Sequence, residues 1–153
     1  DFANRLKVGG NVVLYETRVR FSALPVTGQL YNAYLGMSDL SATSTTAVSA
    51  GSTITNGVYF LLTSSGLQGV CRASSTSSTT STTTITANTW YKLKAIVNSS
   101  SSVDFYVNGV QIGSTVTTNI PTSAVKFTFL LEKTSGTTAV NCDIDYIGWK
   151  MIR

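Results

Sequence analysis

The sequence predicts an all-β protein, a two-sheet antiparallel β-sandwich. Apolar and polar residues alternate with period two in several segments, which is typical of strands with one buried face. Two Asn-Gly pairs, at 56–57 and 108–109, predict tight turns between strands. No segment has the i, i+3, i+4, i+7 apolar spacing of an amphipathic helix, and the many Ser and Thr residues favour pleated structure.

The first half of the chain contains three predicted strands. Residues 11–21 alternate strictly, with Val13, Tyr15, Thr17, Val19 and Phe21 on one face and Val12, Leu14, Glu16, Arg18 and Arg20 on the other. The second face becomes charged along its length, so we expect it to be buried at its start and wet at its end. Residues 30–37 form the next strand after a turn at 25–28, and the apolar run 58–63 forms the third.

Two polar segments interrupt this pattern. Residues 40–56 form a long polar stretch, and a loop of this length in a compact domain is usually functional or contains a short strand. Residues 67–73 and 79–86 are interpreted as a hairpin around 74–78. A low-complexity linker is the alternative for this Ser/Thr tract.

The most regular part of the chain is an antiparallel meander over residues 90–112. Residues 90–97 and 103–107 each alternate between an apolar and a polar face, and 110–112 forms the return strand. Asn108-Gly109 lies between the last two strands and tolerates positive φ at both positions, which favours a type I′ hairpin.

Two further strands, 125–133 and 139–152, complete the sandwich. A length of 153 residues suits a single domain over residues 1–153. Because the sequence starts at Asp1 without a methionine, we expect it to be the C-terminal part of a longer or processed chain.

A family resemblance lies in the same region as the meander. The pattern W-Y-x-L-x-x-x-V-N, followed by V-x-F-Y-V-N-G-x-x-I-G and T-N-I-P, spans residues 90–121. It resembles the second half of concanavalin A-like (laminin-G-like) jelly-roll domains, especially those of bacteriophage structural proteins. The resemblance implies a concanavalin A-like jelly roll. It also implies a virion location, self-association as a homotrimer, and contact with other virion proteins.

Catalysis is not expected. Enzymes with the concanavalin A-like fold that this sequence resembles are mostly glycoside hydrolases, and one such family carries Glu-x-Asp-x-x-Glu on a strand. Residues 143–148 read Asp-Ile-Asp-Tyr-Ile-Gly, which lacks the last acidic residue of that motif. Retaining hydrolysis needs two carboxyl groups with distinct roles. The sequence has no histidine, so a Ser-His-Asp triad is impossible.

Candidate ligand-binding residues come from the aromatic residues and their polar neighbours. Sugar binding needs an aromatic platform with amide or carboxylate partners, and Tyr106 shares a strand face with Asp104 and Asn108. Tyr31 is the other candidate. Most of the remaining aromatic residues, Trp90 above all, are interpreted as packing residues. No metal or cofactor is expected, although Asp39 beside the polar 40–56 stretch is the one candidate calcium ligand.

Charge and cysteine content give weaker indications. The net charge of +4 comes from scattered basic residues, so nucleic-acid binding is not expected. No apolar run reaches the length of a membrane span. Cys71 and Cys142 are interpreted as small apolar thiols, although a disulfide stays open because the sequence gives no distance between them.

Three hypotheses about function follow. The leading one is a non-enzymatic bacteriophage virion module (fibre, spike or capsid decoration), with host-surface glycans as a possible ligand. The alternative is a carbohydrate-binding module of a secreted, polysaccharide-active protein. The third is a hydrolase, which the missing acidic residue disfavours. Any binding surface is expected on loops such as 40–56 and 74–80.

Overall fold

The computed structural model describes residues 6–8, 12–40 and 53–152. Eleven strands are assigned in this part of the chain. They are β1 (Leu6–Lys7), β2 (Val12–Phe21), β3 (Tyr31–Ser38), β4 (Gly57–Thr63), β5 (Gly66–Ala73), β6 (Thr76–Thr79), β7 (Trp90–Asn98), β8 (Ser102–Val107), β9 (Val110–Gln111), β10 (Ala124–Lys133) and β11 (Cys142–Ile152). The predicted all-β class is therefore confirmed.

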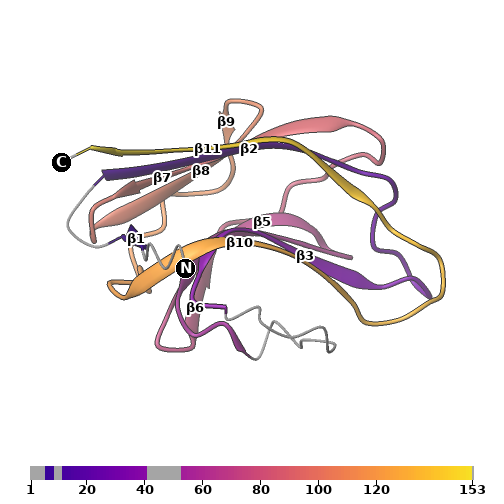
Figure 1. Cartoon of the computed structure of the whole chain (residues 1–153), viewed down its shortest axis with the longest axis horizontal. Helices are drawn as coiled ribbons and strands as arrows, with labels where there is room; N and C mark the ends of the chain where they lie inside the picture. Colours follow the sequence, from indigo (N-terminus) through magenta and orange to yellow (C-terminus); the bar gives the residue numbers. More distant parts are fainter. Residues whose placement is uncertain (1–5, 9–11, 41–52, 153) are drawn as a thin grey trace, which may run out of the picture.

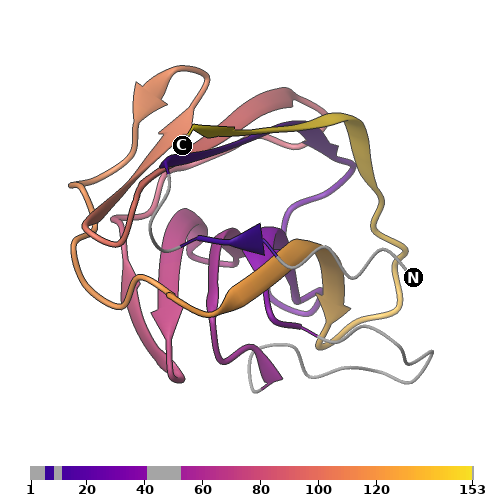
Figure 2. The same cartoon turned by 60° about the vertical axis from the view of Figure 1, so that its left-hand side comes forward.

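The strands form two antiparallel sheets that face each other (Figures 1 and 2). One sheet has six strands in the order β1-β10-β3-β4-β5-β6, and the other has five in the order β11-β2-β7-β8-β9. The last strand, β11, pairs with β2 near the start of the chain. This is the predicted two-sheet sandwich of the jelly-roll type.

The core fills the space between the sheets. Phe60 of the six-stranded sheet and Phe105 of the five-stranded sheet meet edge to face, with ring centroids 5.2 Å apart. Phe105 also lies against Gly69 of β5, where a Cβ atom would stand 2.2 Å from the ring carbon Cγ. The absence of a side chain at Gly69 thus lets an aromatic ring from the opposite sheet reach the backbone.

The alternation of β2 and of the meander is confirmed. Val13, Tyr15, Thr17, Val19 and Phe21 are all buried. The opposite face of β2 is only half-buried at Val12 and Leu14, because it is the outer face of the five-stranded sheet. The expectation that this face starts inside the core is therefore wrong.

Turn predictions have mixed outcomes. Asn108 and Gly109 have φ of 51° and 83°, as a type I′ hairpin requires. Asn56-Gly57 forms no such turn, because Gly57 already begins β4 and neither residue has positive φ. The Asn56 side chain instead donates a hydrogen bond to Asp39 and accepts one from the Ser74 amide.

The Ser/Thr tract forms a shorter hairpin than expected. The turn is only Ser74-Ser75, with φ of 49° and 66°, and the second strand ends at Thr79 instead of reaching residue 86. Residues beyond it contribute one isolated bridge, between Thr83 and Leu67. The last strand, expected from residue 139, begins at Cys142.

A second apolar cluster covers the outer face of the six-stranded sheet. Its members are Tyr34, Leu40, Ile54, Tyr59 and Val70. Leu40 and Ile54 belong to the predicted long polar stretch 40–56, of which residues 41–52 lie outside the described part of the chain. In the described ranges, no helix is long and apolar enough to span a membrane.

Candidate functional site

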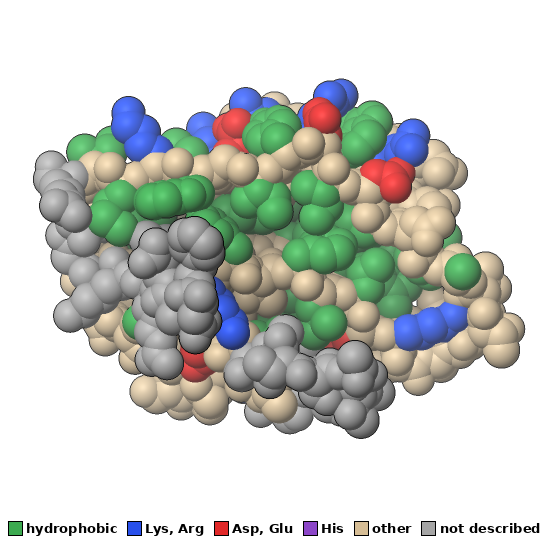
Figure 3. Space-filling view, viewed as in Figure 1, with side chains coloured by type: hydrophobic (Ala, Val, Ile, Leu, Met, Phe, Trp, Pro, Cys, Tyr) green, Lys and Arg blue, Asp and Glu red, His purple; other side chains and the backbone are tan. Residues whose placement is uncertain are grey.

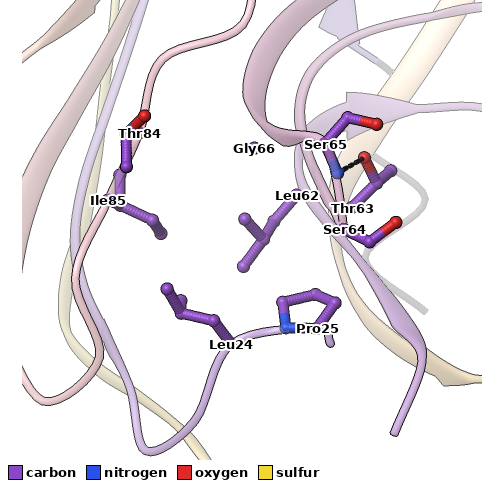
Figure 4. A pocket seen from close by; sticks show the side chains of 9 residues that line it. All are labelled: Leu24, Pro25, Leu62, Thr63, Ser64, Ser65, Gly66, Thr84 and Ile85. Carbon is purple, nitrogen blue, oxygen red and sulfur yellow. Dashed lines mark hydrogen bonds between the residues drawn. The ribbon is translucent and has the colours of Figure 1, made fainter. Parts of the chain in front are cut away.

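A pocket opens at one end of the sandwich, and three separate segments line it (Figure 4). The β2–β3 connection contributes Leu24 and Pro25. The end of β4 and its turn contribute residues 62–66, and the segment after β6 contributes Thr84 and Ile85. The cavity volume is about 190 Å³. We call it the end pocket.

Hydrogen bonds fix the β4–β5 turn and join β5 to the segment that follows β6. Ser64-Ser65 forms a two-residue turn between β4 and β5, and the Ser65 amide donates to the Thr63 hydroxyl at 3.2 Å. Leu67 and Thr83 exchange two backbone hydrogen bonds of 2.9 and 2.7 Å. The segment carrying Thr84 and Ile85 is therefore fixed beside β5, although it is not part of a regular strand.

The end pocket has an apolar floor and a hydroxyl rim. Leu62 and Ile85 are buried and point into the pocket from opposite sides, with Leu24 and Pro25 below them (Figure 4). Ser64, Ser65 and Thr84 are exposed at the rim. This arrangement can pack against the C–H face of a small polyhydroxylated ligand while hydroxyl groups hydrogen-bond its edge.

The lining residues of the end pocket carry no ionisable side chain. Proton transfer by a positioned side chain needs a group such as a carboxyl, imidazole or amine within hydrogen-bond reach of the reacting atom. The residues that line the end pocket therefore offer apolar and hydroxyl groups for binding, and no side chain for acid–base catalysis.

A second, wider groove lies between residues 78–81 and 113–118, with a volume of about 480 Å³. Its lining is mostly Ser and Thr, and some hydroxyls already bond each other, as Ser78 and Thr118 do at 2.6 Å. Asn119 donates a further hydrogen bond to the Ser78 hydroxyl at 2.8 Å. Val116 is the one apolar side chain among the residues that line this groove, so the groove lacks the apolar floor of the end pocket.

Three predicted site residues, Asp104, Tyr106 and Asn108, lie at the outer face of the five-stranded sheet. The Asp104 carboxylate accepts a hydrogen bond from Thr115 at 2.5 Å and one from Gln111 at 3.3 Å. The Asn108 side chain accepts one from the Lys92 amide at 2.8 Å. Asp104 and Asn108 thus hold neighbouring segments in place.

Tyr106 keeps a partly exposed ring, but Lys94 Nζ stands 4.5 Å from its centroid. Tyr31, the fourth predicted residue, is buried in the core, and its hydroxyl donates to the Ala23 carbonyl at 2.6 Å. Burial raises the pKa of the Tyr31 hydroxyl. Tyr31 therefore offers no aromatic face to a ligand, and the structure does not bring it together with the other three.

The outer face of the same sheet carries a cluster that the sequence did not reveal. Arg18 and Arg20 place their guanidinium carbons 5.0 and 5.1 Å from the centroid of Trp90. Arg18 pairs with Asp145 at 2.9 Å, and Arg20 pairs with Asp143 at 2.7 Å. The i, i+2 arginine pair was visible in the sequence, but its position beside Trp90 depends on the β2–β7 register.

This cluster accounts for the two carboxylates of residues 143–148. Each is paired with an arginine at the exposed surface, where ion pairs add little stability. The nearby guanidinium groups also occupy space around the Trp90 ring, so Trp90 is a poor platform for a sugar. Packing of its ring against Arg18 and Arg20 agrees with its interpretation as a packing residue.

Glu16 lies beside this cluster with its own partners. Its carboxylate accepts a hydrogen bond from the Tyr146 hydroxyl at 2.9 Å and pairs with Lys92 at 3.1 Å. Partial burial acts to raise the pKa of Glu16, but the bonds from Lys92 and Tyr146 outweigh it and lower the pKa below the ordinary value.

Asp39, the candidate calcium ligand, instead closes the base of the long polar stretch. Its carboxylate accepts hydrogen bonds from the Thr55 amide at 3.0 Å, the Thr55 hydroxyl and the Asn56 side chain. Among the described residues, no group of three or more His, Cys, Asp or Glu side chains could hold a metal ion. Cys71 and Cys142 are both free thiols.

Comparison with known protein families identifies the family to which the chain belongs. The profile of the family described as "SO2946-like, C-terminal domain" matches residues 35–145, so the chain belongs to this family. No curated protein matches the sequence.

Several solved structures share the fold. The carbohydrate-binding module CBM66 from Bacillus subtilis superposes with a TM-score of 0.57 at 13% identity, covering 92% of this chain and 76% of that one. An alginate lyase from Corynebacterium sp. gives 0.58 at 14%, covering 95% and 60%. The alginate lyase AlyA1 from Zobellia galactanivorans gives 0.59 at 16%, covering 95% and 64%. At these identities the likeness shows the jelly-roll fold alone.

Proposed function

We propose that this domain is a non-catalytic carbohydrate-binding module, and that the end pocket receives one sugar residue of a glycan. The observation that carries the proposal is the composition of the pocket. An apolar floor of Leu24, Pro25, Leu62 and Ile85 lies below the hydroxyl groups of Thr63, Ser64, Ser65 and Thr84. A pyranose ring has the matching character, with C–H groups on its faces and hydroxyls around its edge.

The size of the end pocket agrees with a single sugar residue. Pockets for drug-sized ligands usually span roughly 300–1,000 Å³. The end pocket, at about 190 Å³, is smaller than that range. A longer glycan would leave its remaining residues over the exposed turn Ser64-Ser65.

The named neighbours of the fold agree with this class of function. Besides CBM66, they include a botulinum neurotoxin type C structure whose title describes interaction with two ganglioside molecules, at 15% identity and a TM-score of 0.55. This chain covers 32% of that neurotoxin chain. CBM66 is therefore the neighbour whose name supports glycan binding on this sandwich, and for this chain glycan binding is our proposal.

The absence of catalysis is part of the same proposal. Alginate lyases share the fold, so the direct check is to incubate the protein with alginate and measure the ultraviolet absorbance of unsaturated sugar ends. We expect no increase above a buffer control. An increase that scales with protein concentration would contradict the binding-only function.

The bacteriophage setting rests on the resemblance of residues 90–121 alone. A virion adhesion module and a secreted polysaccharide-binding module would both use a glycan site, so they differ in their genes' neighbours. Capsid or tail genes beside this one would favour a virion module. A polysaccharide-degrading catalytic domain in the same gene would favour the secreted module.

The binding test uses a glycan array followed by calorimetry with the strongest ligand. Thr84→Trp places an indole at the rim of the end pocket and should reduce affinity by at least about tenfold. The matched control is Thr117→Trp, because Thr117 is also an exposed threonine but lines the wider groove. Equal loss in both variants, or loss only in Thr117→Trp, would place the ligand elsewhere.

A further inference from the structure

One long side of the sandwich leaves apolar side chains open to solvent. Phe127 and Phe129 of β10 are 41% and 42% exposed, and Ile147 and Trp149 of β11 are 47% and 55% exposed. We call these four residues the edge strip. Figure 3 shows hydrophobic side chains gathered in a band between the two layers on this side. Exposed apolar patches of this kind mark interaction sites.

The edge strip is the rim of the core itself. Ile147 and Trp149 pair in register with the buried Thr17 and Tyr15, so they lie on the inner face of the five-stranded sheet. Phe127 pairs with the buried Met37 on the inner face of the other sheet. Phe127 and Trp149 are 6.1 Å apart between ring centroids, so the strip is continuous from one sheet to the other.

The strand that carries half of this strip also has an open hydrogen-bonding edge. In the order β11-β2-β7-β8-β9, β11 is terminal and spans eleven residues. Its outer backbone groups have no strand partner among the described residues. A long, apolar edge strand is a template for pairing with another strand, and proteins usually shield such edges.

We propose that β11 pairs with β11 of a second copy of this chain, antiparallel about a two-fold axis near Gly148. This interface is separate from the proposed glycan site and does not depend on it. The two five-stranded sheets would then form one continuous sheet, and the edge strips of the two copies would meet.

The charges along β11 favour this arrangement. Asp143 and Asp145 lie in its first half and Lys150 in its second half. Antiparallel pairing about Gly148 sets Lys150 of each copy beside Tyr146 and Asp145 of the other copy. Parallel pairing would set like charges opposite each other, which is destabilising. A two-fold interface needs such self-complementarity.

The apolar residues match in the same register. With the axis at Gly148, Trp149 of one copy lies beside Ile147 of the other, on the same face of the joined sheet. Gly148 leaves room for close approach, because a Cβ atom there would meet only the Glu16 carbonyl oxygen, at 3.8 Å. Charge and apolar character thus select the same pairing.

The test is sedimentation velocity over a concentration series. Wild-type protein should form a dimer, and Ile147→Lys should raise the dimer dissociation constant by more than about tenfold. The matched control is Val110→Lys on β9, because β9 is the opposite edge of the same sheet and Val110 is 69% exposed. It should dimerise like wild type.

A crosslinking experiment tests the same interface independently, in case Ile147→Lys fails to fold. In a Cys142→Ser background, Gly148→Cys should form a disulfide-linked dimer under mild oxidation, whereas Val110→Cys should not. A wild-type protein that stays monomeric or forms a trimer would overturn the proposal. So would an unchanged Ile147→Lys dimer, or equal crosslinking at both cysteine positions.

Discussion

Substitution of Gly69 by alanine tests the packing of the two sheets most sharply. A Cβ atom at this position would lie 2.2, 2.4 and 2.6 Å from the Cγ, Cδ2 and Cδ1 atoms of Phe105. Phe105 is 1% exposed and is packed against Phe60 on another side, so its ring has little space into which it can move. The added methyl group therefore strains the core.

Overpacking of this kind costs about 1–3 kcal/mol. For a chain of this length, that corresponds to a fall in melting temperature of roughly 2–12 °C. Urea denaturation followed by tryptophan fluorescence measures the loss directly. Ser123→Ala is the control, because Ser123 is exposed, lies just before β10 and belongs to neither the end pocket nor the proposed dimer interface. We expect its stability to lie within about 0.5 kcal/mol of wild type.

A double-mutant cycle identifies the clash as the cause. Phe105→Leu should cost less stability in the Gly69→Ala background than in wild type, because the smaller side chain relieves the contact. Two results would refute the reasoning. One is Gly69→Ala with wild-type stability, and the other is an equal cost of Phe105→Leu in both backgrounds.

Three further predictions concern single side chains. Glu16→Gln should destabilise the protein at neutral pH. Because the folded-state pKa of Glu16 is lowered, its contribution to stability is present above the ordinary pKa of 4.5 and disappears as the pH falls through the folded-state pKa. The urea midpoints of the two proteins should therefore converge in acid, and a pH-independent difference between them would refute this. Asn108→Ala should lower the free energy of unfolding by about 1–2 kcal/mol, because it removes the hydrogen bond from the Lys92 amide and places alanine at a φ of 51°. An unchanged urea midpoint would contradict a stabilising role for Asn108. Burial raises the pKa of the Cys71 thiol to about 12, so native protein should react with a thiol reagent at Cys71 only after unfolding, and fast labelling without denaturant would contradict its burial.

Strands β2, β7 and β8 were predictable because their burial is one-sided. In β2, every second residue from Val13 to Phe21 faces the core, and this alone fixes the period. A hairpin near residue 74 was predicted, but the two-residue length of the Ser74-Ser75 turn was not, because serine carries no preference for the positive φ that both residues adopt. At Asn56-Gly57 the sequence predicted a turn, but the asparagine amide is used to bridge Asp39 and Ser74.

The candidate site was less predictable than the fold. Asp104 and Asn108 are polar residues at a strand face, which is also the pattern of residues that fasten a hairpin and its neighbours. The end pocket combines segments near residues 24, 63 and 84, which approach one another only after the sheets form. No local pattern of apolar or hydroxyl residues distinguishes such a lining from ordinary turns.

The most direct measurement of the central claim is an NMR titration of isotope-labelled protein with the glycan that binds best on the array. Occupation of the end pocket predicts saturable shifts of the backbone amides of residues 62–66 and 84–85, with Thr84→Trp abolishing them. Shifts confined to residues 78–81 and 113–118, or to the edge strip, would contradict the proposed site. Failure of every arrayed glycan to bind would contradict the proposed function.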